Sequence, residues 1–467
     1  MTRLQVRGMK RLDGASRAFI VERSEADDYT GAPMFRTSAT LLALTFLAAC
    51  GSTTDGTSST PAPAPGAQGN QPATADQADA GPEVDHGAPS DVYPAPHPDP
   101  PQVVSAGGSV LKTPRIVPIF FKGDAMKAQV VEFAGKIGAT PFWSANTTEY
   151  GVGAASAGDA VEIDETPAAT LSDADVALYM RSLFDGKHGL GTEPDPNTIY
   201  TIYYPHTTTI ELSGGMSGSE TSCDAFGGYH DSTTTADFKK TIVYAVIPEC
   251  PDFGGLSGID AITATSSHEW LEAVTDPNPT TDPAFATVDD DHAVWSFFLG
   301  GSETGDMCAQ DPTSFYIPKE LGVAVQRSWS NAAAKAGHDP CVPAIDNGPY
   351  FNAAPVLPDT IKLSSGRGGD AVATKGIKIP VGESRTIEVD LFSDGPTNGP
   401  WQVKARSLDF SNTKTLDLTL DRQSGQNGEK LYLTIKALAA SPYKASAFMI
   451  NSRLGERRTR WVGMVAN

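Results

Sequence analysis

Long apolar runs without alternation mark the middle of the chain and predict buried strands. Three runs of strand length lie at Arg115–Phe121, Ile199–Tyr204 and Thr241–Ile247. Between the first two, apolar residues recur at helical spacing after Ser172, a favourable helix cap, so we expect a helix there. Residues 104–346 are therefore predicted to form an α+β core with a mixed sheet.

The pattern changes in the C-terminal part, residues 350–467. Short alternating runs separated by turn residues are found at Arg385–Phe392, Thr415–Leu420 and Lys430–Ile435. Alternation with a period of two is typical of strands that bury one face. We therefore predict a C-terminal β-sandwich after the α+β core.

An export signal lies near the N-terminus. Residues 34–50 have a basic start, a short apolar run and small residues before a cysteine, as in a signal peptide. Leu47–Cys50 resembles the bacterial lipobox, whose cysteine is lipidated and becomes the mature N-terminus. Residues 1–33 are polar, which favours Met34 as the initiator.

The stretch after Cys50 is predicted to be a disordered tether over residues 50–103. It consists of Ser, Thr, Pro, Ala, Gly, Asp and Gln with almost no large apolar residues, so it cannot bury enough surface to fold. We expect an extracytoplasmic protein that a lipid anchors to a bacterial membrane, either the outer membrane or the cell surface.

The net charge of the chain limits the classes of partner that it can bind. The 467 residues carry a net charge of -21, which argues against nucleic acid because phosphate backbones are bound by clustered Lys and Arg. Residues 350–467 contain 16 Lys and Arg against 11 Asp and Glu, a net +5, so residues 1–349 carry -26. Partners consistent with this are the membrane, through the lipid, and a peptide or cell-wall polysaccharide.

Cysteine usage agrees with export. If Cys50 carries the lipid, an even set remains, namely Cys223, Cys250, Cys308 and Cys341. Four cysteines allow three pairings, and the sequence leaves them open. Pairing each cysteine with its neighbour in the chain closes the shortest loops. A Cys-ligated zinc site is disfavoured because no Cys-x-x-Cys spacing exists.

Candidate chemistry is concentrated on one predicted helix, which ends at Pro277. We expect this helix to bury one face, formed by Ile259, Ile262, Ser266, Trp270 and Ala273. His268 and Glu272 are four residues apart, so their side chains lie on the same face and can bind one metal ion. In zinc hydrolases, the residue after the first ligand is the carboxylate that takes a proton from metal-bound water. We therefore predict Glu269 as the catalytic base and Zn²⁺ as the cofactor.

A third ligand is needed, and two carboxylates are candidates: Asp306 and Glu303. His230, in a Gly-rich loop after Cys223, is a weaker candidate. Calcium is also considered, because Asp289–His292 is an acidic segment, although it lacks the Gly and terminal Glu of an EF-hand loop.

Several motifs together resemble the EXORDIUM or phosphate-induced protein family of plants and its bacterial relatives. The resemblance covers roughly residues 104–345 and is strongest at Ser267–Pro277. The other motifs are Tyr150–Gly153, Ile199–Pro205, Cys223–His230, Tyr244–Pro248, Gly305–Cys308 and Gln326–Asn331. Family members are secreted and associated with cell-wall growth, so the resemblance implies a secreted protein. The His-Glu-x-x-Glu helix also resembles that of zincin metallopeptidases, with Glu272 where the usual pattern has a second His.

Two functional hypotheses follow. The favoured one is a lipid-anchored, metal-dependent hydrolase of the peptidase type. The alternative is a non-enzymatic cell-surface binding protein in which the same residues hold a structural ion or none. A serine hydrolase is disfavoured because the sequence has no Gly-x-Ser-x-Gly motif.

Overall fold

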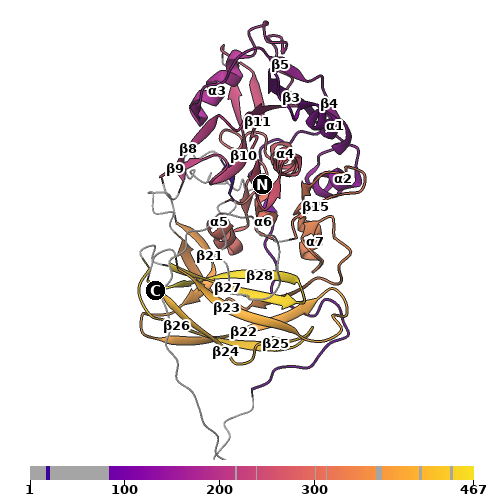
Figure 1. The fold of residues 1–467 in the computed structure, drawn as a ribbon. Helices are drawn as coiled ribbons and strands as arrows, with labels where there is room; N and C mark the ends of the chain where they lie inside the picture. The colour runs from indigo at the N-terminus through magenta and orange to yellow at the C-terminus, as the bar shows by residue number, and fades with distance from the viewer. Residues whose placement is uncertain are drawn as a thin grey trace, which may run out of the picture. The chain divides into compact units, whose positions relative to one another are not determined.

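The computed structural model describes residues 17–20, 84–215, 218–237, 239–299, 301–311, 313–363, 371–409, 413–441 and 445–467. The expected signal peptide, Cys50 and most of the expected tether lie outside the described residues. By its contacts, the chain divides into one unit of Met1–Glu22 and His86–Asn467 and another of Arg23–Asp85. The first unit holds all the elements discussed below, and most of its regular structure is β (Figure 1). No helix among the described residues has the length and apolarity to cross a bilayer.

A mixed sheet lies at the centre of the α+β region. Its order is β1-β10-β11-β7-β3-β4, and β5 also pairs with β3. Strands β3, β7 and β11 run parallel, whereas β10 is antiparallel to β11 and β1 is antiparallel to β10. These parallel strands are the three apolar runs, so that prediction is confirmed. The bounds are β1 Arg17–Ile20, β3 Arg115–Phe121, β4 Ser156–Ala157, β5 Val161–Ile163, β7 Thr198–Tyr204, β10 Phe226–Thr234 and β11 Thr241–Pro248.

Helices cover both faces of this sheet, which explains why its central strands are apolar without alternation. On one face, Val176 and Met180 of α3 pack against Tyr200 and Tyr204. On the other, α1 and α4 pack against the sheet in a second apolar cluster. Helix α3 is the helix expected after Ser172, whose side chain and that of Asp175 form a capping box. The α-helices are α1 Lys127–Ile137, α2 Pro141–Thr147, α3 Asp173–Ser182, α4 Ile259–Thr275, α5 Ala293–Leu299, α6 Asp306–Ala309 and α7 Asn331–Lys335.

Short elements and two disulfides complete this region. Cys223 pairs with Cys250 and Cys308 with Cys341, the two shortest-loop pairings. Disulfides of this kind indicate an oxidising, extracytoplasmic compartment. The 3₁₀ helices are Thr148–Tyr150 and Asp290–His292. The small sheets are β2 Val103–Val104 with β14 Thr287–Val288, β6 Thr170–Ser172 with β8 Thr209–Gly215 and β9 Gly218–Thr221, β12 Asp252–Phe253 with β13 Leu256–Ser257, β15 Phe315–Tyr316 with β16 Val325–Gln326, and β17 Ser328–Trp329 with β18 Cys341–Val342.

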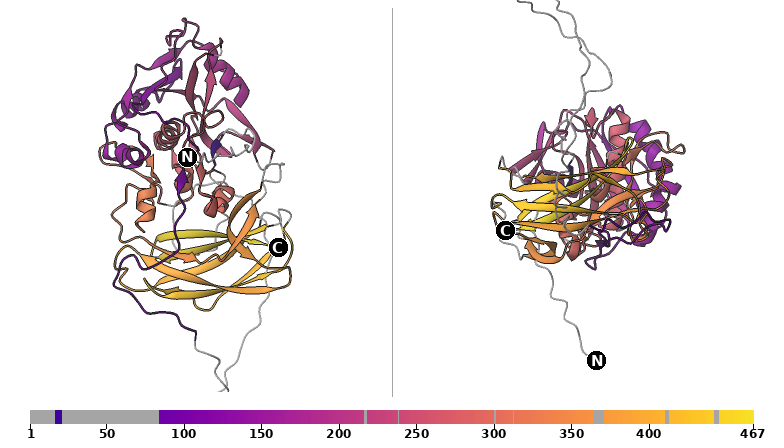
Figure 2. Two further views of the ribbon diagram at one scale, coloured as in Figure 1. Left: turned by 180° about the vertical axis from the view of Figure 1, so that it is seen from behind. Right: turned by 90° about the horizontal axis from the view of Figure 1, so that it is seen from below.

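Two sheets that share one apolar core form the C-terminal region (Figure 2). One has the order β19-β22-β26-β24 and the other β20-β21-β28-β27-β23-β25. Three of these strands, β22, β24 and β26, coincide with the alternating runs of the sequence. The bounds are β19 Phe351–Pro355, β20 Asp359–Leu363, β21 Val372–Lys378, β22 Ser384–Ser393, β23 Trp401–Leu408, β24 Leu416–Leu420, β25 Ser424–Gly425, β26 Lys430–Ala437, β27 Ala445–Leu454 and β28 Arg457–Ala466.

Residues 84–103 differ from the expected tether. Ala95 is buried, and its N–H donates to Asn427 Oδ1 at 3.0 Å. The Asn427 amide donates in turn to the carbonyl of Ser90 at 2.8 Å. This segment therefore lies against the C-terminal sheets through hydrogen bonds between its backbone and the Asn427 side chain, which require no large apolar side chains in the segment. Residues 86–103 therefore belong to the folded unit rather than to a tether.

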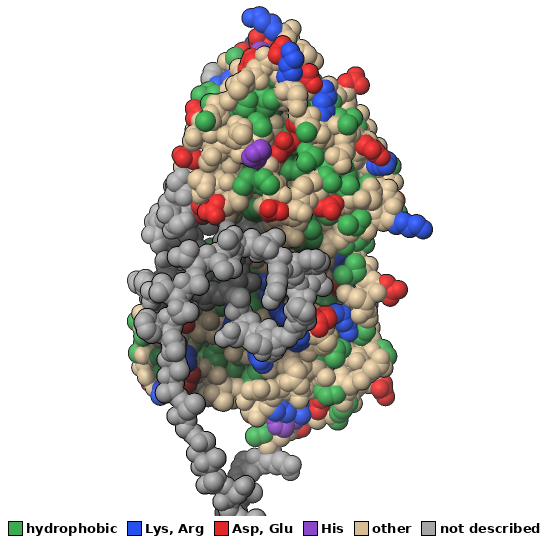
Figure 3. Space-filling model, in the orientation of Figure 1, with side chains coloured by type: hydrophobic (Ala, Val, Ile, Leu, Met, Phe, Trp, Pro, Cys, Tyr) green, Lys and Arg blue, Asp and Glu red, His purple; other side chains and the backbone are tan. Residues whose placement is uncertain are grey.

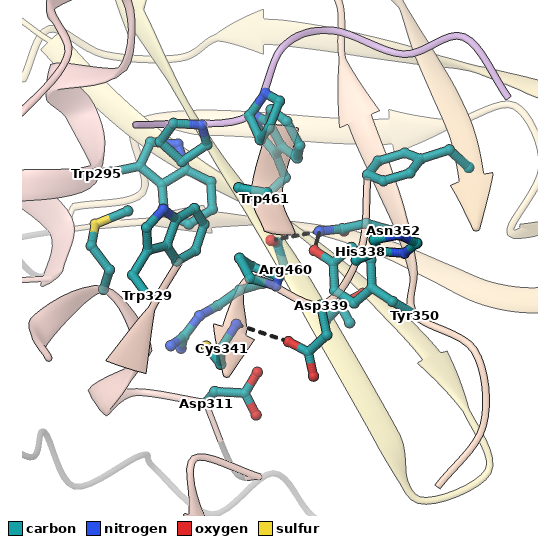
Figure 4. Close-up of a pocket in the computed structure, with 17 residues that line it drawn as sticks. Trp295, Asp311, Trp329, His338, Asp339, Cys341, Tyr350, Asn352, Arg460 and Trp461 are labelled. Carbon is teal, nitrogen blue, oxygen red and sulfur yellow. Dashed lines mark hydrogen bonds between the residues drawn. The ribbon is translucent and has the colours of Figure 1, made fainter. Parts of the chain in front are cut away.

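Aromatic side chains join the two regions. Trp295 and Trp329 of the α+β region and Trp461 of β28 belong to one buried cluster. Together with Tyr350 they line a cavity of about 40 Å³ (Figure 4), which has room for one or two waters. This cavity lies at the junction of the α+β region and the C-terminal sheets.

Candidate metal centre

Helix α4 carries the residues that the sequence singled out, and it is buried on all sides. Every residue from Ala261 to Thr275 is buried, although the sequence suggested only one apolar face. The sheet packs against one side of α4. The chain before and within β16 covers another side: the Thr263 hydroxyl donates to the Ala324 carbonyl, and the Ser267 hydroxyl accepts from the N–H of Gln326. The His-Glu-x-x-Glu motif therefore lies in the interior, where unpaired charge is costly.

The first ligand group consists of His268, Glu272 and Asp306. His268 Nε2 lies 3.3 Å from Glu272 Oε1 and 4.0 Å from Asp306 Oδ1. Asp306 is the first residue of α6, and its N–H donates to Glu272 Oε1 at 3.0 Å. Asp306 Oδ2 accepts from the N–H of Glu303 at 3.2 Å, which fixes the orientation of this carboxylate. Of the two third-ligand candidates, Asp306 is thus the one placed beside His268.

A second group consists of His230, Glu269 and Glu272. His230 lies in β10, and its Nδ1 is 3.6 Å from both Glu269 Oε2 and Glu272 Oε2. Its Nε2 lies 3.1 Å from the Asp276 carbonyl oxygen and 3.9 Å from Glu303 Oε1. His230, the weakest candidate from sequence, is therefore central to the site. The feature of the sequence that could have identified His230 is the pair Gly227 and Gly228, which allows β10 to approach α4 closely.

Three glycines provide room for the carboxylates. A Cβ at Gly228 would lie 3.0 Å from Glu269 Oε1, and one at Gly305 would lie 2.8 Å from Glu272 Oε1 and from His268 Nδ1. A Cβ at Gly301 would overlap the Asp306 carboxylate. Larger residues at these positions would displace the ligand side chains.

The electrostatics of the site follow from burial and proximity. Burial opposes protonation of His268, but the negative charges of Glu272, Glu269 and Asp306 outweigh it and raise its pKa to about 10. Burial likewise opposes protonation of His230, and the pKa is nevertheless raised by Glu269 and Glu272. Burial raises the pKa of Glu269, whereas the pKa of Glu272 is lowered against the effect of burial, chiefly by His268. Within the part of the chain described, neither Glu269 nor Glu272 pairs with Lys or Arg.

The ligand atoms match the requirements of a zinc site. Ligand atoms about 2.0–2.2 Å from a tetrahedral Zn²⁺ lie roughly 3.3–3.6 Å from one another. The measured separations between histidine nitrogens and carboxylate oxygens in the two groups are 3.3–4.0 Å. Calcium fits less well, since it prefers six to eight oxygen ligands.

The acidic segment Asp289–His292, considered above as a calcium site, has a structural role. Asp289 accepts hydrogen bonds from the N–H of Gln102 and lies 2.7 Å from His292 Nδ1. His292 Nε2 lies 2.9 Å from the Asp99 carbonyl. These side chains hold the segment before residue 103 to the folded unit, and they do not gather with the α4 ligands.

Access to the site involves β1. The exposed fractions of the six residues are 0–1% for His230, His268, Glu269, Glu272 and Glu303, and 6% for Asp306. Strand β1 pairs with β10, with Arg17 opposite His230, and it also lies near α6. Strand β1 therefore lies along the two elements that carry His230 and Asp306.

Comparison with known proteins assigns no family to the chain. No family description matches it, and no curated protein matches it. Among solved structures, the titin M3 domain matches 20% of this chain and 85% of that domain, with 11% identity and a TM-score of 0.14. The titin M10–obscurin-like 1 Ig complex matches 20% of this chain and 83% of that chain, with 13% identity and a TM-score of 0.14. Similarity at such scores carries no argument about fold or function.

Proposed function

We propose that this protein is an extracytoplasmic, lipid-anchored, metal-dependent hydrolase of the peptidase type. The observation that carries the proposal is the convergence of His268, Glu272 and Asp306 around one point, with Glu269 beside them. His268, Glu272 and Asp306 hold the ion, and Glu269 receives a proton from water. A bound Zn²⁺ acidifies water and polarises a substrate carbonyl.

The residues around Glu269 suit a base. Its carboxylate is buried, which raises its pKa and brings it closer to the pH at which a general base works well. His230 Nδ1 lies 3.6 Å from Oε2 of this carboxylate. The carboxylate ligands lower the net charge of the ion, so water at this site needs a nearby base more than at an all-His site.

Strand β10 suits an extended peptide as substrate. Its partner β1 is an extended segment that runs antiparallel beside His230, and an open sheet edge binds extended peptides by the same backbone hydrogen bonds. In the mature protein that we propose, cleavage before Cys50 removes β1. The β10 edge is then available to a peptide substrate next to the metal ligands.

The resemblance to the EXORDIUM family supports the location of the site. Three of its motif segments, Cys223–His230, Ser267–Pro277 and Gly305–Cys308, contribute His230, the α4 ligands and Asp306 to the same cluster. Segments far apart in the sequence meet at one place, as expected if they serve one function. Membership of this family remains part of the proposal.

One observation favours the alternative, a structural ion in a non-enzymatic surface protein. All six residues are at most 6% exposed, and structural zinc sites are closed, whereas catalytic ones keep an open position. Under this alternative, metal stabilises the fold, and the chain cleaves no peptide whether or not residues 1–49 are present.

Metal analysis with a chelator-sensitive peptide-cleavage assay tests the proposal. The full chain is compared with His268→Gln, Glu269→Gln and a variant cut before Cys50. We expect His268→Gln to lose the ion of the first group, and Glu269→Gln to retain it while activity falls by on the order of 100-fold or more. His188→Gln is the control, because His188 also lies between two carboxylates, Asp185 and Glu165, but at the surface. A wild-type protein without metal, or a Glu269→Gln enzyme with full activity, would contradict the proposal.

Anchoring is tested separately. Wild-type protein should be found in the membrane fraction with a lipid mass on Cys50, and Cys50→Ala should be released. A Cys50→Ala protein that stays in the membrane, together with a wild type of unmodified mass, would refute the anchor.

A further inference from the structure

The Glu272 carboxylate faces a different set of ligand atoms with each of its oxygens. Oε1 lies 3.3 Å from His268 Nε2 and accepts from the N–H of Asp306. Oε2 lies 3.6 Å from His230 Nδ1, which is also 3.6 Å from Glu269 Oε2. Two three-residue groups therefore share Glu272, with one oxygen directed at each.

The hydrogen bond of His230 prepares its other nitrogen for an ion. Nε2 lies 3.1 Å from the Asp276 carbonyl oxygen, and a carbonyl oxygen only accepts, so Nε2 carries the hydrogen. In the neutral ring, Nδ1 then directs a lone pair toward Glu269 and Glu272. Metal-binding histidines commonly donate their other N–H to a backbone carbonyl in this manner.

Glu269 gives independent support. Neither of its carboxylate oxygens has a hydrogen-bond partner among the described residues, and the side chain is fully buried. Burying a carboxylate without a hydrogen-bond partner is costly. Gly228 passes close to Oε1 without filling the space beside it. A cation between Glu269 and His230 accounts for both unpartnered groups.

We propose that His230, Glu269 and Glu272 hold a second divalent ion, so that Glu272 bridges two ions. The inference rests on the proposed function for its first ion. It also changes the role of Glu269, which becomes a metal ligand instead of a base when the second position is filled. Two ions about 3.5–4 Å apart stabilise both the attacking and the leaving oxygen in hydrolysis. The chemistry of the second group, one imidazole and two carboxylates, suits Zn²⁺ or Mn²⁺.

Stoichiometry tests the second position. The full chain is stripped with chelator, titrated with Zn²⁺, desalted and analysed for metal per chain. Wild type and the His188→Gln control should bind two ions, and His230→Gln and His268→Gln should each bind one. The isosteric Glu269→Gln should also fall from two ions to one. Circular dichroism and intact disulfides identify any variant that has failed to fold.

A spectroscopic test on the wild type needs no variant. With two equivalents of Mn²⁺, a carboxylate-bridged pair gives an exchange-coupled electron paramagnetic resonance spectrum, whereas separate sites give two isolated-ion signals. Saturation at one ion, with His230→Gln equal to wild type, would overturn the second position and leave the single-ion hydrolase intact. A wild type that binds no ion would refute both. Two ions and no peptide cleavage would retain the pair and refute the hydrolase.

Discussion

The α+β region and the C-terminal sheets bury different chemistry at their centres. In the α+β region, the buried helix α4 presents His268, Glu269 and Glu272 to the interior. Between the C-terminal sheets, the centre is apolar, with side chains such as Leu391, Leu433 and Trp401 fully buried. The buried ionisable groups around α4 lower the stability of the fold unless other groups or an ion compensate their charge. The apolar core between the C-terminal sheets stabilises the fold directly.

The difference indicates a division of roles. Six ionisable side chains buried around one helix are consistent with the proposed cation site, because apolar residues would pack there at lower cost. The sheets bury nothing comparable in the part of the chain described, and their apolar core suits a stabilising or presenting role. On the face shown in Figure 3, acidic side chains are scattered over the α+β region without forming one patch.

Removal of metal should produce the largest effect and should affect one region only. With free ion at about 1,000 times its Kd, binding contributes about 4 kcal/mol to folding stability. Chelation is therefore expected to accelerate amide hydrogen exchange in α4 and β10 by up to about 1,000-fold. Exchange in β22 and β26 should change little. Equal acceleration of exchange in both regions would show that they unfold as one unit and would contradict the division of roles between them.

The reverse experiment alters the apolar core. Leu433 lies between Ile387 and Leu420 in the register of its sheet and is fully buried. We expect Leu433→Ala to lower the free energy of unfolding by about 3 kcal/mol, as large-to-small core changes do. Urea unfolding measures this change, and metal content should remain that of wild type. Thr434→Ala, at an exposed neighbouring position, is the matched control. Loss of metal in Leu433→Ala would show that the two cores depend on each other.

The sequence predicted the strands better than the site. Apolar runs and alternation identified β3, β7, β11, β22, β24 and β26, because burial on two faces or one leaves a direct pattern. The i,i+4 spacing placed His268 and Glu272 together for a similarly local reason. His230 is 38 positions from His268, so only the pairing of β10 with β11 brings it to α4. No local pattern records such a contact.

Two other expectations failed for physical reasons. The helix α4 was expected to bury one face, but loops as well as the sheet surround it, and polar residues such as Thr263 and Ser267 bond to those loops. The tether was expected to continue to residue 103, since residues 84–103 contain few large apolar side chains. The Asn427 side-chain amide donates hydrogen bonds to the carbonyls of Ser90 and Val92 and holds the segment in place, and composition does not reveal such bonds.

The smallest predicted effect compares one buried acid from each region. Burial and Asp124 raise the pKa of Glu249, after β11, to about 8, and burial and Glu388 raise the pKa of Asp390, in β22, to about 6. Both groups hold a proton more tightly when folded, so their stabilising effect is complete below about pH 4 and is lost as the pH rises through 8 or 6.

Replacing each acid by its neutral amide should remove this pH dependence. One pKa unit corresponds to about 1.4 kcal/mol, and partial exposure reduces the effect, so we expect Glu249→Gln to gain about 2 kcal/mol over wild type at pH 8.5 and Asp390→Asn about 1 kcal/mol. At pH 4 each variant should match wild type. Urea unfolding from pH 4 to 8.5 measures both series. The gain of Asp390→Asn should be complete by about pH 7, whereas that of Glu249→Gln should still be growing, because its carboxyl ionises later. If the two gains appear over the same pH range, the acids of the α+β region are no more strongly perturbed than those of the sheets, and the contrast is confined to α4.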